Sequence, residues 1–219
     1  RFPTTVALAL MAMSVFLTVG ISAGVLAARR RGTSLDRFVV GFSQVFGAIP
    51  YYIVALLFAL YFTVLYPVLP RSARFSDGIG PWLAGLIAPA IVLGLVYSTA
   101  YVRYTRASMV DTLAQDYVRT ARSKGISENT VVYKHALRAA ISPVVTILGL
   151  DLAGLLSGTL ITEQIFGVDG VGRLTIQSLF QDDLPVIMGA VMISCFLVVT
   201  MNLVVDIAYS FVDPRVRLT

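Results

Sequence analysis

The sequence predicts an all-α protein that crosses a membrane several times, and three observations support this fold class. Of its 219 residues, 57% are hydrophobic and only 13% are charged, whereas soluble domains average about 45–50% and about 25%. Mean hydropathy is +0.83. The hydrophobic residues form runs of roughly 20 residues or more, the length that a helix needs to cross the hydrocarbon core. These runs are apolar all round and do not alternate, which disfavours a membrane β-barrel.

Five segments have this length. The first covers residues 5–28 and ends at a cluster of three arginines, residues 29–31. The second lies between Arg37 and Arg71, and Pro50 is expected to bend or start its helical part. The last three cover residues 81–102, 139–162 and 184–212, and single acids interrupt the fourth and fifth, at Asp151 and Asp206.

The basic residues indicate how these segments are oriented. Loops on one side of the five spans carry 13 of the 17 lysines and arginines, which places that side in the cytoplasm by the positive-inside rule. The chain is then expected to start outside and to end with a cytoplasmic C-terminus. This topology explains the positive charge better than nucleic acid binding does, so no nucleic acid partner is expected. Because the chain begins with Arg1, we expect a further helix to precede it.

The longest cytoplasmic segment, residues 103–138, has the pattern of two short helices joined at Gly125. Apolar residues recur at helical spacing in its first half. Acids precede bases there, and Gly125 follows as a C-terminal cap in the left-handed conformation. Ser127 can then cap a second helix. The apolar residues of the first helix are Val110, Leu113, Ala114, Tyr117 and Ala121.

At this segment the sequence resembles the Glu-Ala-Ala loop of ABC importer permeases in its peptide-transporter form. Arg119-Thr120-Ala121 occupies the triplet, Gly125 the glycine, and residues 135–138 the ending, although Arg119 replaces the usual Glu and Arg138 the usual Pro. The stretches Thr162–Phe166, Gly170–Arg173 and Asp182–Val186 agree as well. Nearly the whole chain resembles the B-type subunit of dipeptide and oligopeptide permeases.

This resemblance implies a type I ABC importer permease fold over residues 1–219, in a bacterial inner membrane, with residues 111–138 as the coupling loop. Implied partners are a second homologous permease in a heterodimer, two cytoplasmic ATPases that bind ATP and Mg²⁺, an extracytoplasmic binding protein and a peptide substrate. The residues expected to couple to the ATPases are Asp116, Tyr117, Arg119, Thr120, Ala121, Lys124, Gly125, His135 and Arg138.

The chain itself is not expected to be an enzyme or to bind a cofactor. A nucleotide-binding loop needs a glycine before its lysine, and neither Lys124 nor Lys134 follows a glycine. The single histidine, His135, has no second ligand nearby in the sequence, and the single cysteine, Cys195, lies in an apolar run. A metal site is therefore not expected.

Asp151 is the most informative polar residue inside a predicted span, because an ionised carboxylate at membrane depth costs at least about 2.5 kcal/mol. Gly154, Gly158 and Thr162 share its helix face. This small, polar face can line a translocation pathway, where Asp151 would attract the ammonium group of a peptide, or it can pack against another helix. We also expect Asn202 and Asp206 to pair with loop arginines such as Arg103 or Arg106.

The extracytoplasmic loop 163–183 is rich in glycine and acids. It is either a connector or a contact for the binding protein through Glu163, Phe166 and Arg173. Three alternatives to peptide import stay open at this point. They are a secondary transporter or channel that uses Asp151 as an ion or proton site, a non-transporting assembly subunit, and an ABC permease for nickel complexes or haem.

Overall fold

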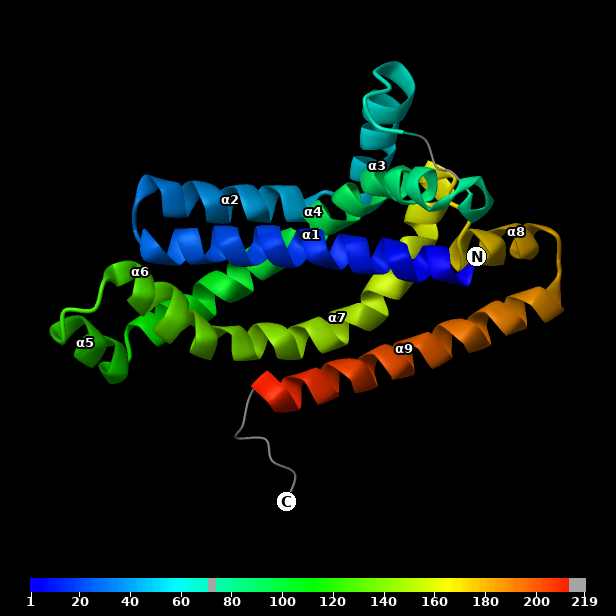
Figure 1. The fold of residues 1–219 in the computed structure, drawn as a ribbon. Helices are drawn as coiled ribbons and strands as arrows, with labels where there is room; N and C mark the ends of the chain where they lie inside the picture. Colours follow the sequence, from blue (N-terminus) through cyan, green and yellow to red (C-terminus); the bar gives the residue numbers. More distant parts are fainter. Residues whose placement is uncertain (71–73, 213–219) are drawn as a thin grey trace. The chain divides into compact units, whose positions relative to one another are not determined.

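The computed structural model describes residues 1–70 and 74–212, apart from the side chains of 149–150, 152–154, 156–158, 197, 201, 204–206 and 208–212. Its described residues form helices and no strands (Figure 1), which confirms the all-α prediction. The elements are α1 (Phe2–Arg29), α2 (Ser34–Ala48), α3 (Tyr51–Ala59), η1 (Leu60–Leu65), η2 (Phe75–Asp77), α4 (Ile79–Leu113), α5 (Asp116–Ser123), α6 (Glu128–Thr130), η3 (Val131–Ala136), α7 (Leu137–Phe166), α8 (Val171–Phe180) and α9 (Leu184–Val212). Helices η1 and η3 are π-helical and η2 is a 3₁₀ turn.

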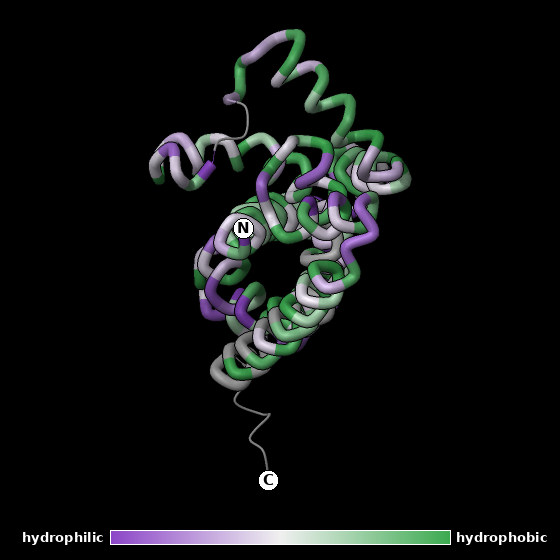
Figure 2. Tube along the Cα trace, turned by 90° about the vertical axis from the view of Figure 1, so that its right-hand side faces the viewer, coloured by the Kyte–Doolittle hydropathy of each residue, from purple (hydrophilic) through white to green (hydrophobic). Residues whose placement is uncertain are grey.

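Every predicted span corresponds to helix in the structure. Among the described residues, three helical stretches are long and apolar enough to cross a membrane, namely α1, α4 and Glu128–Leu148. The second predicted span is broken at Pro50, as expected, and its two parts form a fourth candidate if they count as one. Helix α9 has the predicted bounds. Hydrophobic residues recur along the helices, as the green stretches of Figure 2 show.

The chain folds into two compact units. Among the described residues, the first contains 1–15, 49–70, 74–96 and 150–203. Its core joins α1 to α4 through Leu8, Leu86 and Ala90, with Val168 from the loop after α7. The indole Nε1 of Trp82 in this core donates a hydrogen bond of 3.2 Å to Thr4 Oγ1, which satisfies its only polar atom. The start of α1 is therefore fixed by both apolar and polar contacts.

Among the described residues, the second unit contains 16–48, 97–149 and 204–212. Helix α1 packs closely on α4 here, because Gly24 has no side chain to hold the two helices apart. A Cβ at this position would lie only 2.8 Å from the carbonyl oxygen of Val102. Val25 and Ala28 of α1, Met109 of α4 and Val132 of η3 share one buried cluster. The helices that precede and follow α5 therefore belong to one packed block.

The structure changes the predicted division of the segment 103–138. Helix α4 runs on to Leu113, so Val110 and Leu113 belong to it, and the next helix, α5, begins only at Asp116. The predicted second helix is not separate, because α6, η3 and α7 follow one another without a break. Ser127 makes no side-chain cap, and its hydroxyl lies 2.9 Å from that of Thr130. The left-handed conformation predicted for Gly125 is confirmed, with φ of 76°.

Candidate functional site

Helix α5 is an eight-residue amphipathic helix that is fixed to the second unit by one apolar face. Val118 and Ala121, three residues apart, are buried against Val131 of η3. Leu113 and Ile126 pack around them. Residues three apart lie on the same side of a helix, so this pair orients α5 and leaves its other side facing outward.

The outward side of α5 holds four of the nine predicted coupling residues. Asp116, Arg119 and Thr120 are exposed, and Tyr117 is 47% exposed. Arg119 lies 3.7 Å from Asp116 in an ion pair that is open to solvent, and such pairs contribute little to stability. These side chains are therefore free to bind another surface.

The other five coupling residues lie in four different places. Lys124 and Gly125 end α5 and are exposed, and Arg138 is exposed in the first turn of α7. His135 is half-buried in η3. Ala121 is buried, so it anchors α5 and does not line its outer surface. The predicted set thus divides into an exposed surface and a buried support.

A second contact keeps α5 in place, and sequence reasoning had not found it. The guanidinium of Arg122 donates two hydrogen bonds to the carboxylate of Glu128, of 3.1 and 2.8 Å. This pairing raises the pKa of Arg122 and lowers that of Glu128. Both side chains are about half exposed, so the pair sets the geometry of the turn more than it adds stability.

The same unit contains an ion pair between α2 and α4, in which Asp36 is buried and the side chain of Arg106 is 28% exposed. Arg106 donates from Nε to Asp36 Oδ1 and from Nη2 to Asp36 Oδ2, over 2.5 and 2.7 Å. The sequence had suggested Asn202 or Asp206 as partners of Arg106, and the partner is Asp36 instead. The side chain of Asp206 lies outside the described residues. The spacing from Thr33 to Asp36 is that of a helix-capping box, which is the signal that could have identified Asp36.

At the C-terminal end of α7, Glu163 organises part of the first unit. Its carboxylate is fully buried and accepts hydrogen bonds from the Thr5 hydroxyl (2.7 Å), from the backbone N–H of Arg173 (3.0 Å) and from that of Gly172. Thr5 Oγ1 also accepts the N–H of Val171. Because the first N–H groups of a helix lack partners within it, Thr5 and Glu163 together cap helix α8.

Burial is the dominant influence on the charge state of Glu163, which follows the predicted span 139–162. It raises the pKa of this carboxyl, and the hydrogen bonds from Thr5, Arg173 and Gly172 oppose the rise only in part. Arg173, predicted beside it as a docking residue, is half-buried and donates 2.7 Å to the carbonyl oxygen of Gly167. In this structure Glu163 faces the chain interior, and its predicted contact with a docked protein stays a prediction.

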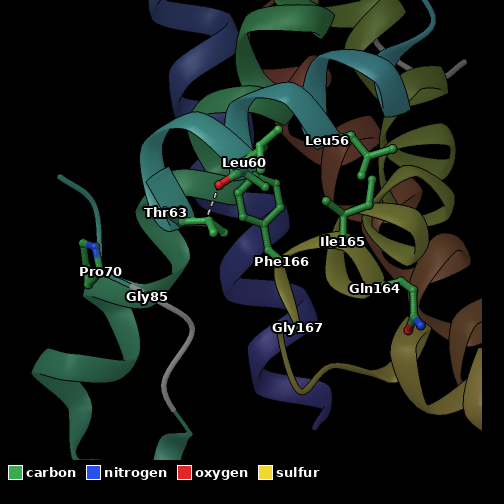
Figure 3. A pocket seen from close by; sticks show the side chains of 11 residues that line it. Leu56, Leu60, Thr63, Pro70, Gly85, Gln164, Ile165, Phe166 and Gly167 are labelled. Atoms are coloured by element: carbon green, nitrogen blue, oxygen red, sulfur yellow. Dashed lines mark hydrogen bonds between the residues drawn. The ribbon is translucent and has the colours of Figure 1, made fainter. Parts of the chain in front are cut away.

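Phe166, the third predicted docking residue, lines a cavity of about 520 Å³ within the first unit. In Figure 3 its ring lies toward Leu60, and Ile165 lies below Leu56. Gln164 also lines the cavity, which is otherwise mostly apolar. Helix α3, η1, α4 and the end of α7 all contribute to this wall.

The structure describes the surroundings of only some residues on the predicted pathway face of α7. Asp151 is half-buried, and Gly154 and Gly158 lie outside the residues whose surroundings are described. Thr162 is 1% exposed, and Thr159, one turn before Glu163, is fully buried. The outer end of this face therefore packs inside the chain, and its role in a pathway stays a prediction.

No cluster of three or more metal-ligating side chains occurs in the described part of the chain.

Comparison with known proteins gives a consistent assignment. A family model described as "Binding-protein-dependent transport system inner membrane component" matches residues 20–218.

Curated relatives match along almost the whole chain. A probable peptide ABC transporter permease of Sinorhizobium fredii is 36% identical over 219 residues, which cover 99% of this chain and 70% of that protein. A putative peptide transport system permease of Brucella abortus is 39% identical with the same coverage. The dipeptide transport system permease DppB of Escherichia coli K12 is 36% identical, over 99% of this chain and 71% of its own.

Solved structures with the same fold are also found. The MetNI methionine ABC transporter, in an inward-facing conformation, matches with a TM-score of 0.79 over 96% of this chain and 93% of that chain, at 18% identity. A chain of an amino acid ABC transporter crystal structure matches with a TM-score of 0.65 over 95% and 90%, also at 18% identity. These likenesses concern the fold, and they confirm the fold class expected from the sequence.

Proposed function

Because this chain belongs to the family of binding-protein-dependent transport system inner membrane components, and is therefore a permease subunit and not an enzyme, we propose that it imports peptides. The observation that carries this proposal is the agreement of several relatives, all named as peptide or dipeptide permeases, over 99% of the chain. The cargo would cross between this subunit and a second, homologous permease.

The proposed mechanism is alternating access driven by two partner ATPases, which bind ATP and Mg²⁺. Helix α5 would seat in a groove of one ATPase, where an amphipathic helix is a suitable receiver of a rigid-body movement. The exposed side chains of Asp116, Tyr117 and Arg119 support this role, since the opposite side of the helix is anchored by Val118 and Ala121. Closure of the ATPase dimer would displace α5. The translocation cavity formed between the two permeases, which is distinct from the cavity lined by Phe166, would then open toward the outside.

Asp151 is proposed to attract the ammonium group of the peptide along this pathway, with Gly154, Gly158 and Thr162 on the same helix face. A carboxylate inside a span is costly unless it faces protein or water. The test replaces Asp151 with Asn and compares the uptake of peptides with free and acetylated amino groups. Selective loss for free-amino peptides supports the role, and equal uptake of both by the variant and the native protein excludes it.

On the outer face, the loop that starts at Glu163 is proposed to contact the binding protein, directly through Phe166 and Arg173. Phe166 lines the cavity and is only half-buried, so part of this residue is accessible to a partner, which supports the proposal. Replacing Phe166 with Ala should weaken the stimulation of ATP hydrolysis by the binding protein. Normal stimulation would make the loop a connector only.

The function as a whole is tested in proteoliposomes that contain this chain, its partner permease and the two ATPases. Peptide uptake should require ATP and the binding protein, and should stop when the ATPases are inactivated. Uptake that continues without ATP but collapses with the proton gradient would indicate a secondary transporter. Competition by a nickel complex or haem, with no uptake of peptides, would change the substrate class.

A further inference from the structure

Helices α2 and α4 of the second unit are joined by a strip of polar contacts. At one end, Asp36 and Arg106 form the bidentate ion pair described above, although they are 70 residues apart. Arg103, nearly one turn earlier on α4, donates from Nη1 to the carbonyl oxygens of Thr99 (3.0 Å) and Ser43 (3.5 Å). The strip thus connects helices that are far apart in the sequence.

Asp36 has a second function within the same strip. Its Oδ2 accepts the N–H of Gly32 over 2.9 Å, and its own N–H lies 3.5 Å from Thr33 Oγ1. Gly32 has φ of 81°, a conformation that suits glycine. The side chain of Asp36 is only 4% exposed. One buried carboxylate therefore closes the turn between α1 and α2 and also binds α4.

Helix α4 continues from this ion pair directly to α5. Met109, one turn beyond Arg106, is packed against η3, and Leu113 at the end of α4 contacts the cluster that contains Val118 of α5. Because these contacts are buried and close-packed, they transmit displacement. A displacement of α5 would therefore be transmitted along α4 to Arg106. The ion pair would then transmit it to α2.

The chemistry of the pair suits this purpose better than it suits stability. Asp36 is buried and Arg106 is 28% exposed. An ion pair that is largely withdrawn from water is often no more stabilising than apolar residues of similar size, because its charges lose hydration. The planar guanidinium fork, however, fixes distance and orientation together. A bidentate pair keeps the register of two helices in a way that apolar side chains, which can slide, do not.

We propose that Asp36 and Arg106 are positioning residues for energy coupling, which fasten α2 to the α4–α5 arm so that both move together when the ATPases close. This inference rests on the proposed function as an ATP-driven permease. Breaking the pair should leave ATP hydrolysis running while less substrate is moved for each ATP consumed.

The test uses the complete complex in proteoliposomes and the double variant Asp36→Asn with Arg106→Gln. Both replacements are neutral, so no buried charge loses its partner, and the amide oxygen introduced by Asp36→Asn can still accept the N–H of Gly32. The measured quantity is peptide uptake divided by ATP hydrolysed. We expect it to fall about 2- to 30-fold, the range found for residues that connect two coupled sites, with assembly and ATP hydrolysis retained.

The matched control is Asp77→Asn. Asp77 also accepts a backbone N–H, that of Arg74, over 2.9 Å, but it is exposed and forms no ion pair in the described part of the chain. Peptide uptake per ATP hydrolysed by the complex with the Asp77→Asn variant should equal that of the native complex. An unchanged ratio in the Asp36/Arg106 double variant would overturn the inference and leave the pair with a structural role alone.

If the double variant does not assemble, Arg106→Lys takes its place. Lysine keeps the opposite charge but cannot form the bidentate fork. A reduced ratio in that variant supports the inference, and a normal ratio overturns it. Failure of the proposed function is a separate result, because it would appear as native complex without ATP-driven peptide uptake.

Discussion

Replacing Glu163 with Ala should loosen helix α8 of the first unit. The substitution removes the acceptor for the N–H groups of Gly172 and Arg173 and for the Thr5 hydroxyl. The hydroxyl can rotate to another partner, but the two backbone groups cannot. Since Glu163 is fully buried, little water can replace its oxygens.

The expected cost follows from these two donors. A buried donor left without an acceptor costs about 1–3 kcal/mol. Part of this loss is offset, because the variant no longer buries a carboxylate, whose raised pKa shows that ionisation is unfavourable there. A net cost of about 2 kcal/mol would speed local opening of α8 roughly 30-fold, since about 1.4 kcal/mol corresponds to a factor of ten.

Hydrogen exchange followed by mass spectrometry measures this effect in the assembled complex. Peptides from Val171–Phe180 should exchange faster in the Glu163→Ala variant, whereas peptides from α5 should be unaffected. The Glu163→Gln variant, which keeps one acceptor, should lie between the alanine variant and the native protein. Native protection of α8 in the alanine variant would refute the idea that Glu163 caps this helix.

Three further predictions concern single groups. The folded-state pKa of Glu163 lies above its ordinary value of 4.5. Protection of α8 against hydrogen exchange should therefore be greatest below pH 4.5 and should fall as the pH rises through the raised pKa. The Glu163→Gln variant should lack this dependence once exchange rates are corrected for their intrinsic pH dependence. Gly94→Ala places a Cβ 2.9 Å from the Ala12 carbonyl oxygen and should cost about 1–3 kcal/mol, read as a lower unfolding temperature, while Gly189→Ala, which meets open space, should not lower it. Gly125→Ala, at φ of 76°, should cost about 1 kcal/mol, and unchanged thermal unfolding would contradict the strain.

The sequence could predict the long helices because each depends on local composition. Residues 184–212 were expected to form one helix, and α9 has these bounds. The break at Pro50 follows from the missing N–H of proline. The resemblance to peptide permeases also identified the family correctly, because motifs in the cytoplasmic and outer loops agreed independently.

The end of α4 could not be predicted from the same signals. Arg103 and Arg106 looked like the start of a cytoplasmic loop, yet the helix continues through them to Leu113. The reason is tertiary, because both arginines are bonded to α2, through the Ser43 carbonyl oxygen and Asp36. Charge indicates where a span leaves the membrane but does not end a helix whose charged side chains have partners.

The site residues divide in the same way. The exposed coupling residues of α5 were accessible to motif comparison, whereas the burial of Glu163 depends on Thr5, which lies 158 residues away. No local pattern indicates such a contact. Glu163 therefore looked like a surface acid in a polar loop, although its carboxylate is enclosed.

Asp36 and Glu163 show how this chain uses acids near its spans. Each carboxylate accepts backbone N–H groups at a turn or a helix start, and each binds one side chain from a remote helix. Both therefore join helices, and neither needs a substrate to compensate its charge. A carboxylate beside a span is thus not by itself a sign of a translocation pathway. For Asp151, the distinction between transport and packing has to come from its dependence on the charge of the peptide, since a joining role would affect free-amino and acetylated peptides equally.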